Sequence, residues 1–342
     1  MQHPTIAVDL AKNVFEIAVS RRVGKVHERK RLPRSQFLSF FADREASLVL
    51  LEACGSAHYW ARKLESLGHR VVLLPPHEVR PYVTRNKTDR SDAKALLEAA
   101  RNEKIRPVPV KSIDQQALCA LHRLRSGWLS TRTARINCVR GLLREFGFVI
   151  PLGAKQVVSR AREIIRDDTS TPAPLSTLLE EACSEIEELE ERVRSAEREI
   201  AALARQEPIV QRLRTIPGIG LLTATALFAM VGGVKRFRSS RHFASYLGLT
   251  PREHSTGNRR RLGSISKQGD VYLRMLLTHG ARSVLCAAAR ARDRNDRLKD
   301  WGRRLQGTRG HNKAAIAVAN KLARIVWAVW QREKDFESVP AA

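Results

Sequence analysis

Several features that mark large protein classes are missing from this 342-residue sequence. No apolar run approaches the roughly 20 residues needed to span a bilayer. The first residues, Met1-Gln-His-Pro4, lead directly into a predicted strand and lack the pattern of a signal peptide. The five scattered cysteines include no Cys-x-x-Cys pair, which argues against a zinc site and indicates reduced, mostly buried thiols of a cytosolic protein.

Acidic residues are scarce relative to basic ones. The chain has 61 Lys and Arg against 35 Asp and Glu, which leaves a net charge of +26 and a pI near 10.9. Such an excess predicts a polyanionic partner, and nucleic acid fits it better than a membrane surface does.

Four of the few acids, Asp9, Glu52, Asp89 and Asp92, are placed as a metal nuclease would need them. The first two each end a short apolar run that predicts a strand, although Asp and Glu are depleted in strands. The last two lie three residues apart in a predicted helix, so they project from one face. Together they could hold two divalent metal ions that clamp a phosphodiester. The alternative is that all four are ordinary surface acids.

Strand and helix signals alternate along residues 1–108, which we interpret as the first domain. Strands are predicted at Ile6–Val8, Val14–Val19, Val26–Arg31, Leu48–Leu51 and Arg70–Leu74, and helices at Ser35–Ala42, 57–67 and Lys87–Arg101. Three early strands followed by strands that alternate with helices predict an α/β domain. The same order of elements is found in the RNase H-like fold.

Residues 109–207 are predicted to form a helical second domain, with a linker at Thr169–Pro174. Near its end, apolar residues recur with alternating spacings of 3 and 4, at Leu179, Ala182, Ile186, Leu189, Val193, Ala196, Ile200 and Leu203. Such a heptad seam favours a coiled coil, either antiparallel or between subunits. The alternative is a long amphipathic helix that packs inside its own subunit.

Residues 208–342 are predicted to form a mostly helical third domain, with helices at Leu221–Val231, Tyr272–Ala289 and Lys313–Trp330. The sequence Ile216-Pro-Gly-Ile-Gly220 precedes the first of these helices and resembles a helix-hairpin-helix element. In such elements glycines, here Gly218 and Gly220, let backbone N–H groups approach a phosphate. A structural turn that binds no phosphate is the alternative. Trp327 and Trp330 are interpreted as core residues.

Hydroxyl and basic residues are interleaved between Gly248 and Gly269. In this segment a hydroxyl surrounded by Arg and Lys could attack a phosphorus centre. A basic loop that only binds phosphate is the alternative.

Seven short motifs in one order resemble the DEDD transposases of insertion-sequence family 110, most closely its 1111 subgroup. They are Val8-Asp9-Leu-Ala-Lys12, Leu51-Glu52-Ala-Cys-Gly55, Asn86-Lys-Thr-Asp89-Arg-Ser-Asp92-Ala93, Ile216-Pro-Gly-Ile-Gly220, Leu247-Gly-Leu-Thr-Pro251, Ser255-Thr-Gly257 and Ile265-Ser-Lys-Gln-Gly269. The resemblance covers nearly the whole chain, and related proteins include DNA invertases of the Piv type.

This resemblance implies an N-terminal RuvC-like domain in which Asp9, Glu52, Asp89 and Asp92 bind Mg²⁺, with two ions per site. It also implies a coiled coil that assembles a dimer or tetramer, and a C-terminal transposase domain with a nucleophilic serine that forms a phosphoserine link to DNA. The active site would be shared between subunits. A bridge RNA encoded by the element would pair with donor and target DNA. A prokaryotic, cytoplasmic protein that joins the nucleoid when bound to DNA is expected.

By this resemblance Ser255 is the nucleophile. The serine of family members often directly precedes glycine, whereas Thr256 holds that place here, so Thr256 is the competing candidate. Ser264 and Ser266 are expected to shape the loop. The neighbouring cations Arg259, Arg260, Arg261 and Lys267 are expected to hold the DNA backbone. The rival functions are a RuvC-like nuclease or junction resolvase that uses water, and a non-catalytic nucleic-acid scaffold.

Overall fold

The structure is a computed structural model that describes residues 4–22, 25–83, 89–167, 172–290 and 296–338. The chain divides into two compact units, residues 1–112 and 113–342. A further division near residue 207 stays a prediction. In the described part of the chain, no helix combines the length and apolarity needed to cross a membrane.

A mixed sheet forms the centre of the first unit. Its described strands follow the order β3-β2-β1-β4-β5, with the first three antiparallel and β1, β4 and β5 parallel. The strands span Thr5–Leu10 (β1), Val14–Ser20 (β2), Glu28–Pro33 (β3), Leu48–Glu52 (β4) and Arg70–Leu74 (β5). This α/β layout agrees with the predicted RNase H-like domain.

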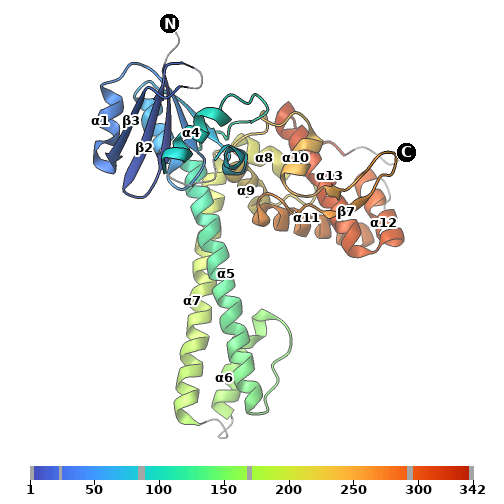
Figure 1. The fold of residues 1–342 in the computed structure, drawn as a ribbon. Coiled ribbons are helices and arrows are strands. Elements are labelled where there is room, and N and C mark those ends of the chain that lie inside the picture. The colour runs from blue at the N-terminus through green and yellow to red at the C-terminus, as the bar shows by residue number, and fades with distance from the viewer. Residues whose placement is uncertain (1–3, 23–24, 84–88, 168–171, 291–295, 339–342) are drawn as a thin grey trace. The chain divides into compact units, whose positions relative to one another are not determined.

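Helices cover both faces of this sheet because its strands alternate two sets of apolar side chains. One set, which includes Ile6 and Val8, packs against α1 and α2, and the other, which includes Ala7 and Leu50, packs against α3 and α4. The helices span Phe37–Ala42 (α1), Ala57–Ser66 (α2), Pro76–Val79 (α3) and Asp89–Ala99 (α4), with short 3-10 turns at Arg34–Gln36 and Arg80–Tyr82. Figure 1 shows α1 and α4 on opposite sides of the strands.

The predicted elements of the first unit form, with shifted ends. Strand β3 covers Glu28–Pro33 instead of Val26–Arg31, because its pairing with β2 runs from Glu28 opposite Val19 to Pro33 opposite Val14. Its charged residues suit its position at the edge of the sheet, where one side of a strand meets water. Helix α4 begins at Asp89, and residues 87 and 88 of the predicted helix Lys87–Arg101 lie outside the described residues.

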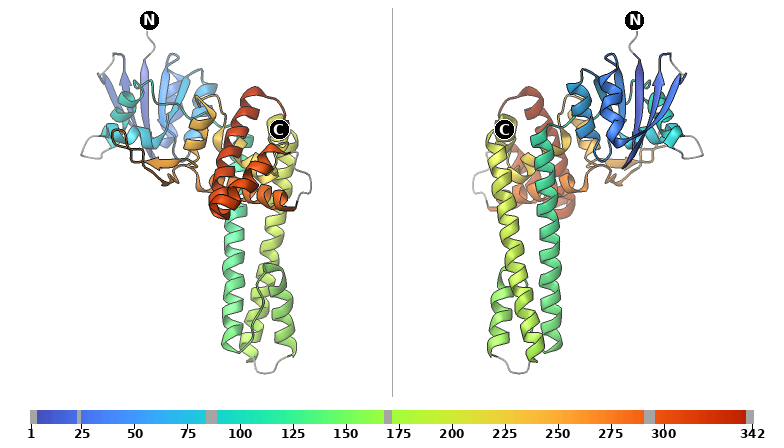
Figure 2. Two further views of the ribbon diagram at one scale, coloured as in Figure 1. Left: turned by 90° about the vertical axis from the view of Figure 1, so that its right-hand side faces the viewer. Right: turned by 90° about the vertical axis from the view of Figure 1, so that its left-hand side faces the viewer.

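A long helical hairpin begins the second unit. Helices α5 (Ile113–Glu145) and α7 (Ala173–Arg205) have 33 residues each and therefore extend about 50 Å. They pack side by side and antiparallel, as Figures 1 and 2 show. The ion pairs Arg125–Glu197, Arg132–Glu190 and Arg135–Glu185 join them in a steadily reversed order. Helix α6 (Val157–Asp167), after a 3-10 turn at Ala154–Gln156, packs against α7.

The predicted heptad seam of α7 is buried within this chain, where it faces α5. At its two ends Cys183 and Ala204 are buried in place of the predicted Ala182 and Leu203. The spacing there is 4 residues instead of 3, as expected of a helix that keeps 3.6 residues per turn. The seam therefore has an antiparallel partner inside its own subunit. Pairing between subunits stays a prediction, and residues 168–171 of the predicted linker lie outside the described residues.

A helical core with one β-hairpin completes the second unit. Its elements are α8 (Pro208–Arg214), α9 (Leu221–Val231), α10 (Ser240–Tyr246), β6 (Pro251–Glu253), β7 (Leu262–Ile265), α11 (Val271–Arg290), α12 (Arg297–Arg309) and α13 (His311–Arg332). Helices α11, α12 and α13 pack against one another (Figure 1). The three helices predicted here are confirmed, and Trp327 and Trp330 pack against the core as predicted.

Candidate functional site

Asp9 and Glu52 end two neighbouring parallel strands of the sheet. Val8 in β1 pairs with Leu51 in β4, so the next residue on each strand is the acid. Alternation along a strand gives Asp9 the face of Ala7 and Glu52 the face of Leu50. Ala7 and Leu50 pack against α3 and α4, so both carboxylates are on the side of the sheet that these helices cover.

Asp92 reaches the same place from α4, which packs against β1 and β2. Asp9, Glu52 and Asp92 line one cavity of about 1090 Å³, which we call the acidic cavity. Three of the four predicted acids therefore line the same cavity. The side chain of the fourth, Asp89, lies outside the described residues, although its backbone begins α4.

The acidic cavity has the donor chemistry of a divalent-metal site. Oδ1 of Asp92 is shielded from solvent and has no hydrogen-bond partner in the described part of the chain. Burial, and then the charges of Glu52 and Asp9, raise the pKa of the Cys54 thiol. A shielded carboxylate oxygen and a concentration of negative charge both suit Mg²⁺, which prefers oxygen ligands. Among the described residues, however, no three acidic, His or Cys side chains gather closely enough to hold an ion.

Imidazole, guanidinium and thiol side chains also line the acidic cavity, and the sequence analysis did not place them there. His77 of α3 and Arg80 of the following 3-10 turn lie in its wall, together with Cys54. The two prolines that precede His77, Pro75 and Pro76, indicate a break between secondary-structure elements. Hydrophobic periodicity therefore cannot reveal which of the following side chains face the acids.

Ser255 lies in the loop between β6 and β7, and we call residues 251–265 the serine hairpin. The Ser255 hydroxyl donates a hydrogen bond to Oε1 of Glu253 over 2.7 Å. The Oγ atom of Ser255 also accepts a hydrogen bond from the backbone N–H of Arg261 over 3.1 Å. Ser255 is exposed, so its oxygen is oriented by two partners and accessible to a large substrate.

Glu253 is a functional candidate that the sequence analysis missed. It accepts from Ser255 and forms an ion pair with Arg260, whose Nε lies 3.5 Å from the same carboxylate oxygen. The sequence signal that could have revealed Glu253 is its spacing from Ser255, since residues two apart in an extended segment share a face. A carboxylate that holds a serine hydroxyl can accept its proton.

Thr256, the competing candidate, is held by its backbone. Its N–H donates to the carbonyl of Arg259 over 3.2 Å, and the N–H of Arg259 donates back over 3.1 Å. Arg259, Arg260 and Arg261 are all exposed in this loop. Their guanidinium groups are therefore accessible to a polyanion.

The remaining predicted residues of this segment are at the base of the hairpin. Lys267 has φ of 55°, and its N–H donates to the carbonyl of Gly248 over 3.2 Å. Ser266 donates its N–H to Thr250, and its hydroxyl oxygen is shielded without a partner in the described residues. Ser264 lies in β7. Both serines are in the paired base, as expected for residues that shape the loop.

The two glycines of the helix-hairpin-helix-like turn have different surroundings. Gly218 has φ of 83°, and a Cβ built there would lie 2.6 Å from the carbonyl oxygen of Gly280 in α11. Packing therefore accounts for Gly218. Gly220 is exposed, precedes the first residue of α9 and has no atom within 4 Å of a built Cβ. Of the two, Gly220 has the accessible backbone that a phosphate would need.

Two transposase family models match separate regions of this chain. Residues 6–148 match the transposase family model DEDD_Tnp_IS110, and residues 210–296 match the transposase IS116/IS110/IS902 family model. A probable family 20 transposase of Pseudomonas aeruginosa is 45% identical over 96% of this chain and 97% of its own. The transposase for insertion sequence element IS1111A of Coxiella burnetii is 37% identical over 97% of this chain and 90% of its own.

A more distant relative is the pilin gene-inverting protein of Moraxella bovis, 24% identical over 84% of this chain and 81% of its own. The first two relatives match this chain over nearly its whole length, and the two family models cover the regions that contain the acids and Ser255. The chain therefore belongs to the IS116/IS110/IS902 family of transposases and is a DNA transposase or recombinase.

Proposed function

We propose that this transposase cuts and rejoins DNA strands with divalent metal ions, Mg²⁺ by its ligand chemistry, and with Ser255 as a covalent nucleophile. The observation that carries the proposal is the acidic cavity, where Asp9, Glu52 and Asp92 converge from two strands and a helix. Asp89, one helical turn before Asp92, would complete the set of ligands. Bound ions would activate the scissile phosphate and stabilise the leaving oxygen.

The side chains of the cavity wall would act on the same phosphate. His77 and Arg80 line the same cavity as the carboxylates, and Arg80 carries a guanidinium group with several N–H donors. An arginine can hold two phosphate oxygens at once, which orients the group for in-line attack. The proposed role of Arg80 is therefore to position DNA.

The serine chemistry would begin with a proton transfer. Glu253 accepts the Ser255 proton along the 2.7 Å hydrogen bond as Oγ attacks phosphorus. The Oγ–P bond forms, the bond from phosphorus to the leaving sugar oxygen breaks, and that oxygen takes a proton from water. In the second step a DNA hydroxyl attacks the phosphoserine and releases its proton to water, while Ser255 recovers its proton from Glu253. No external energy source is needed, because one phosphodiester replaces another.

Basic residues of the serine hairpin would hold the DNA backbone. Arg259, Arg260 and Arg261 are exposed around Ser255, and Lys267 lies at the base of the hairpin. Contacts of this kind bind phosphates without reading sequence. Choice of sequence would come from a guide RNA that pairs with DNA, so the protein needs only to read backbone shape. The net charge of +26 supports binding of both polyanions.

The acids belong to the first unit and Ser255 to the second. In the proposed reaction they act on one phosphate, either within one chain or across two subunits of a dimer or tetramer. The alternative function is a RuvC-like nuclease or resolvase in which water attacks and Ser255 only binds phosphate. The hydrogen bond between Ser255 and Glu253 favours the covalent reaction.

A denaturing-gel assay tests the proposal. Protein purified with RNA from its own element is incubated with labelled junction DNA and Mg²⁺, with RNase-treated samples in parallel. We expect an SDS-resistant protein–DNA adduct that is lost in Ser255→Ala and Asp9→Asn, kept in the matched control Thr256→Ala and reduced by RNase. Cleavage without an adduct, unchanged in Ser255→Ala, would establish the water-using nuclease. A fully active Asp9→Asn protein would exclude the metal site.

A further inference from the structure

A basic groove lies between the base of the serine hairpin and the helices behind it. Its volume is about 400 Å³, within the range of small-ligand sites. Pro251 and Ile265, which pair across the base of the hairpin, form one wall. Trp301 of α12 and one stripe of α13 form the other. The stripe consists of Lys313, Ile316, Ala317, Asn320, Lys321 and Arg324.

The basic groove selects for negative charge. Its lining residues include three cations, Lys313, Lys321 and Arg324, and no carboxylate among the residues that the structure describes. No described acid forms an ion pair with any of the three. The Nε of Arg324 is shielded from solvent and lacks an acceptor in the described residues. A shielded donor without an acceptor is costly, so a bound anion would relieve it.

The residues that line the basic groove also include apolar side chains and one aromatic ring. The Lys321 ammonium lies 5.3 Å from the centroid of the Trp301 ring, in cation–π range. Leu249 and Ile316 extend the apolar surface beside it. Cations next to an aromatic ring are typical of sites that stack an unpaired base and hold its phosphates.

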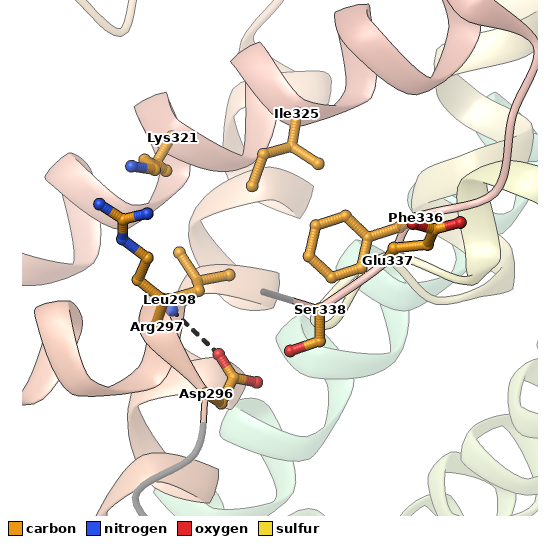
Figure 3. Close-up of a pocket in the computed structure, with 8 residues that line it drawn as sticks. All are labelled: Asp296, Arg297, Leu298, Lys321, Ile325, Phe336, Glu337 and Ser338. Carbon is orange, nitrogen blue, oxygen red and sulfur yellow. Dashed lines mark hydrogen bonds between the residues drawn. The ribbon is translucent and has the colours of Figure 1, made fainter. Parts of the chain in front are cut away.

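A second cavity on α13 provides a contrast, and Figure 3 shows it. It also includes Lys321, with Arg297, but Asp296 and Glu337 contribute carboxylates. Asp296 is already engaged, because its Oδ1 accepts from the N–H of Leu298 over 2.9 Å. Mixed charge gives this cavity no preference for a polyanion. Of these two cavities, the basic groove is the one whose charges favour phosphate.

We propose that the basic groove binds one unpaired nucleotide of the DNA strand that the transposase cuts. The base would stack on Trp301, and the adjoining phosphates would contact Lys313, Lys321 and Arg324. Pro251 is four residues from Ser255, so the groove lies within about 14 Å of the serine along the hairpin. That distance spans only a few nucleotides. The inference rests on the proposed function, since it assumes that Ser255 attacks this strand.

Equilibrium binding without cleavage tests the groove directly. Fluorescence anisotropy would compare labelled single-stranded DNA, blunt duplex DNA and single-stranded RNA of one sequence, in EDTA, across a salt series. The variant is Lys321→Ala/Arg324→Ala. Its control, Arg304→Ala/Arg309→Ala, removes the same charge from exposed residues of α12 outside the groove.

For single-stranded DNA we expect the groove variant to lose about tenfold in affinity and about 1.4 in the slope of log K against log salt, since each phosphate contact contributes about 0.7. The control should change both much less. Trp301→Ala should bind single-stranded DNA about 5- to 100-fold more weakly and bind the duplex with unchanged affinity. Trp301→Phe should recover part of the affinity for single-stranded DNA. Thermal unfolding checks that Trp301→Ala folds. If Trp301→Ala does not fold, the groove variant Lys321→Ala/Arg324→Ala still tests the proposal.

Equal losses for single strand and duplex, or losses no larger than those of the control, would overturn the proposal. A loss confined to RNA would also overturn it and assign the groove to the guide. If wild type bound single-stranded DNA in EDTA as expected but formed no adduct in Mg²⁺, the serine chemistry would be contradicted and the groove proposal would stand.

Discussion

The Ser255 hydroxyl and the Glu253 carboxylate are joined by a hydrogen bond of 2.7 Å at the exposed end of a two-stranded hairpin. The backbone N–H of Arg261 holds the same hydroxyl oxygen, which leaves the proton directed at Glu253. Arg260 balances the carboxylate charge. This is the arrangement of a nucleophile beside a base, with the base oriented by a third group.

Glu253→Gln should slow adduct formation by about 100-fold or more, because an amide can still accept the hydrogen bond but cannot take the proton. DNA binding should remain, since the exposed arginines are untouched. Single-turnover adduct kinetics would measure the effect. Glu337→Gln, at another exposed acid of the second unit, is the matched control. An unchanged rate in Glu253→Gln would remove Glu253 from the reaction.

Asp92→Asn should abolish cleavage and leave DNA binding. It should also weaken the stabilisation by Mg²⁺, because a bound ion raises the melting temperature only of a protein that holds it. Thermal unfolding with Mg²⁺ and with EDTA would show a rise for wild type and for Asp43→Asn, an exposed acid outside the acidic cavity. An equal rise in Asp92→Asn would mean that Asp92 is not a ligand.

Gly218→Ala should lower the free energy of unfolding by about 2 kcal/mol or more, because the new methyl group would meet the Gly280 carbonyl oxygen at 2.6 Å. Gly220→Ala meets no atom within 4 Å and should fold normally. Urea unfolding separates the two. If Gly220 contacts a phosphate, Gly220→Ala should weaken DNA binding at full stability. If both variants have wild-type stability and wild-type DNA affinity, neither the packing role of Gly218 nor the phosphate contact of Gly220 holds.

His122 should make the second unit less stable as the pH falls. Its Nε2 lies 3.0 Å from Thr225 Oγ1 and its Nδ1 lies 3.0 Å from the Tyr272 hydroxyl. Burial, and then the charge of Arg125, lower its pKa to about 4 from 6.5. The unfolded chain therefore binds the proton first. Stability is full above pH 6.5 and declines toward pH 4, by about 3 kcal/mol at most.

Urea unfolding at several pH values would measure this decline, and His122→Gln should reduce its slope even if it lowers stability throughout. His58 should give a similar decline for the first unit, because burial, and then the charges of Lys111 and Arg62, lower its pKa to about 4. An unchanged slope in His122→Gln would assign the pH dependence elsewhere.

Local patterns were enough to predict the five strands of the first unit, the buried face of α7 and the placement of Asp9, Glu52 and Asp92 on one cavity, but not the strands β6 and β7. Each depends on neighbours in sequence or on the rule that parallel strands end at one edge. Asp9 and Glu52 could be foreseen because each ends an apolar run and alternation gives it a face.

Contacts between distant segments were not predictable in this way. The partner of α7 is α5, whose arginines pair with glutamates about 50 to 70 residues away. The basic groove joins a strand pair to helices α12 and α13, and no periodicity links Pro251 to Arg324. Asp89 was predicted from its spacing, but its side chain lies outside the described residues.

Backbone contacts fix the base of the serine hairpin. A side chain at Gly248 would collide with the Gln268 backbone, and one at Gly269 with the Tyr246 carbonyl. Backbone-to-backbone packing therefore fixes the base of the hairpin, and the loop residues 254–261 do not contribute to these contacts. The base of the hairpin and its loop are therefore held by separate contacts. Substitutions in the loop can change the chemistry around Ser255 while the base and the basic groove beside it keep their form.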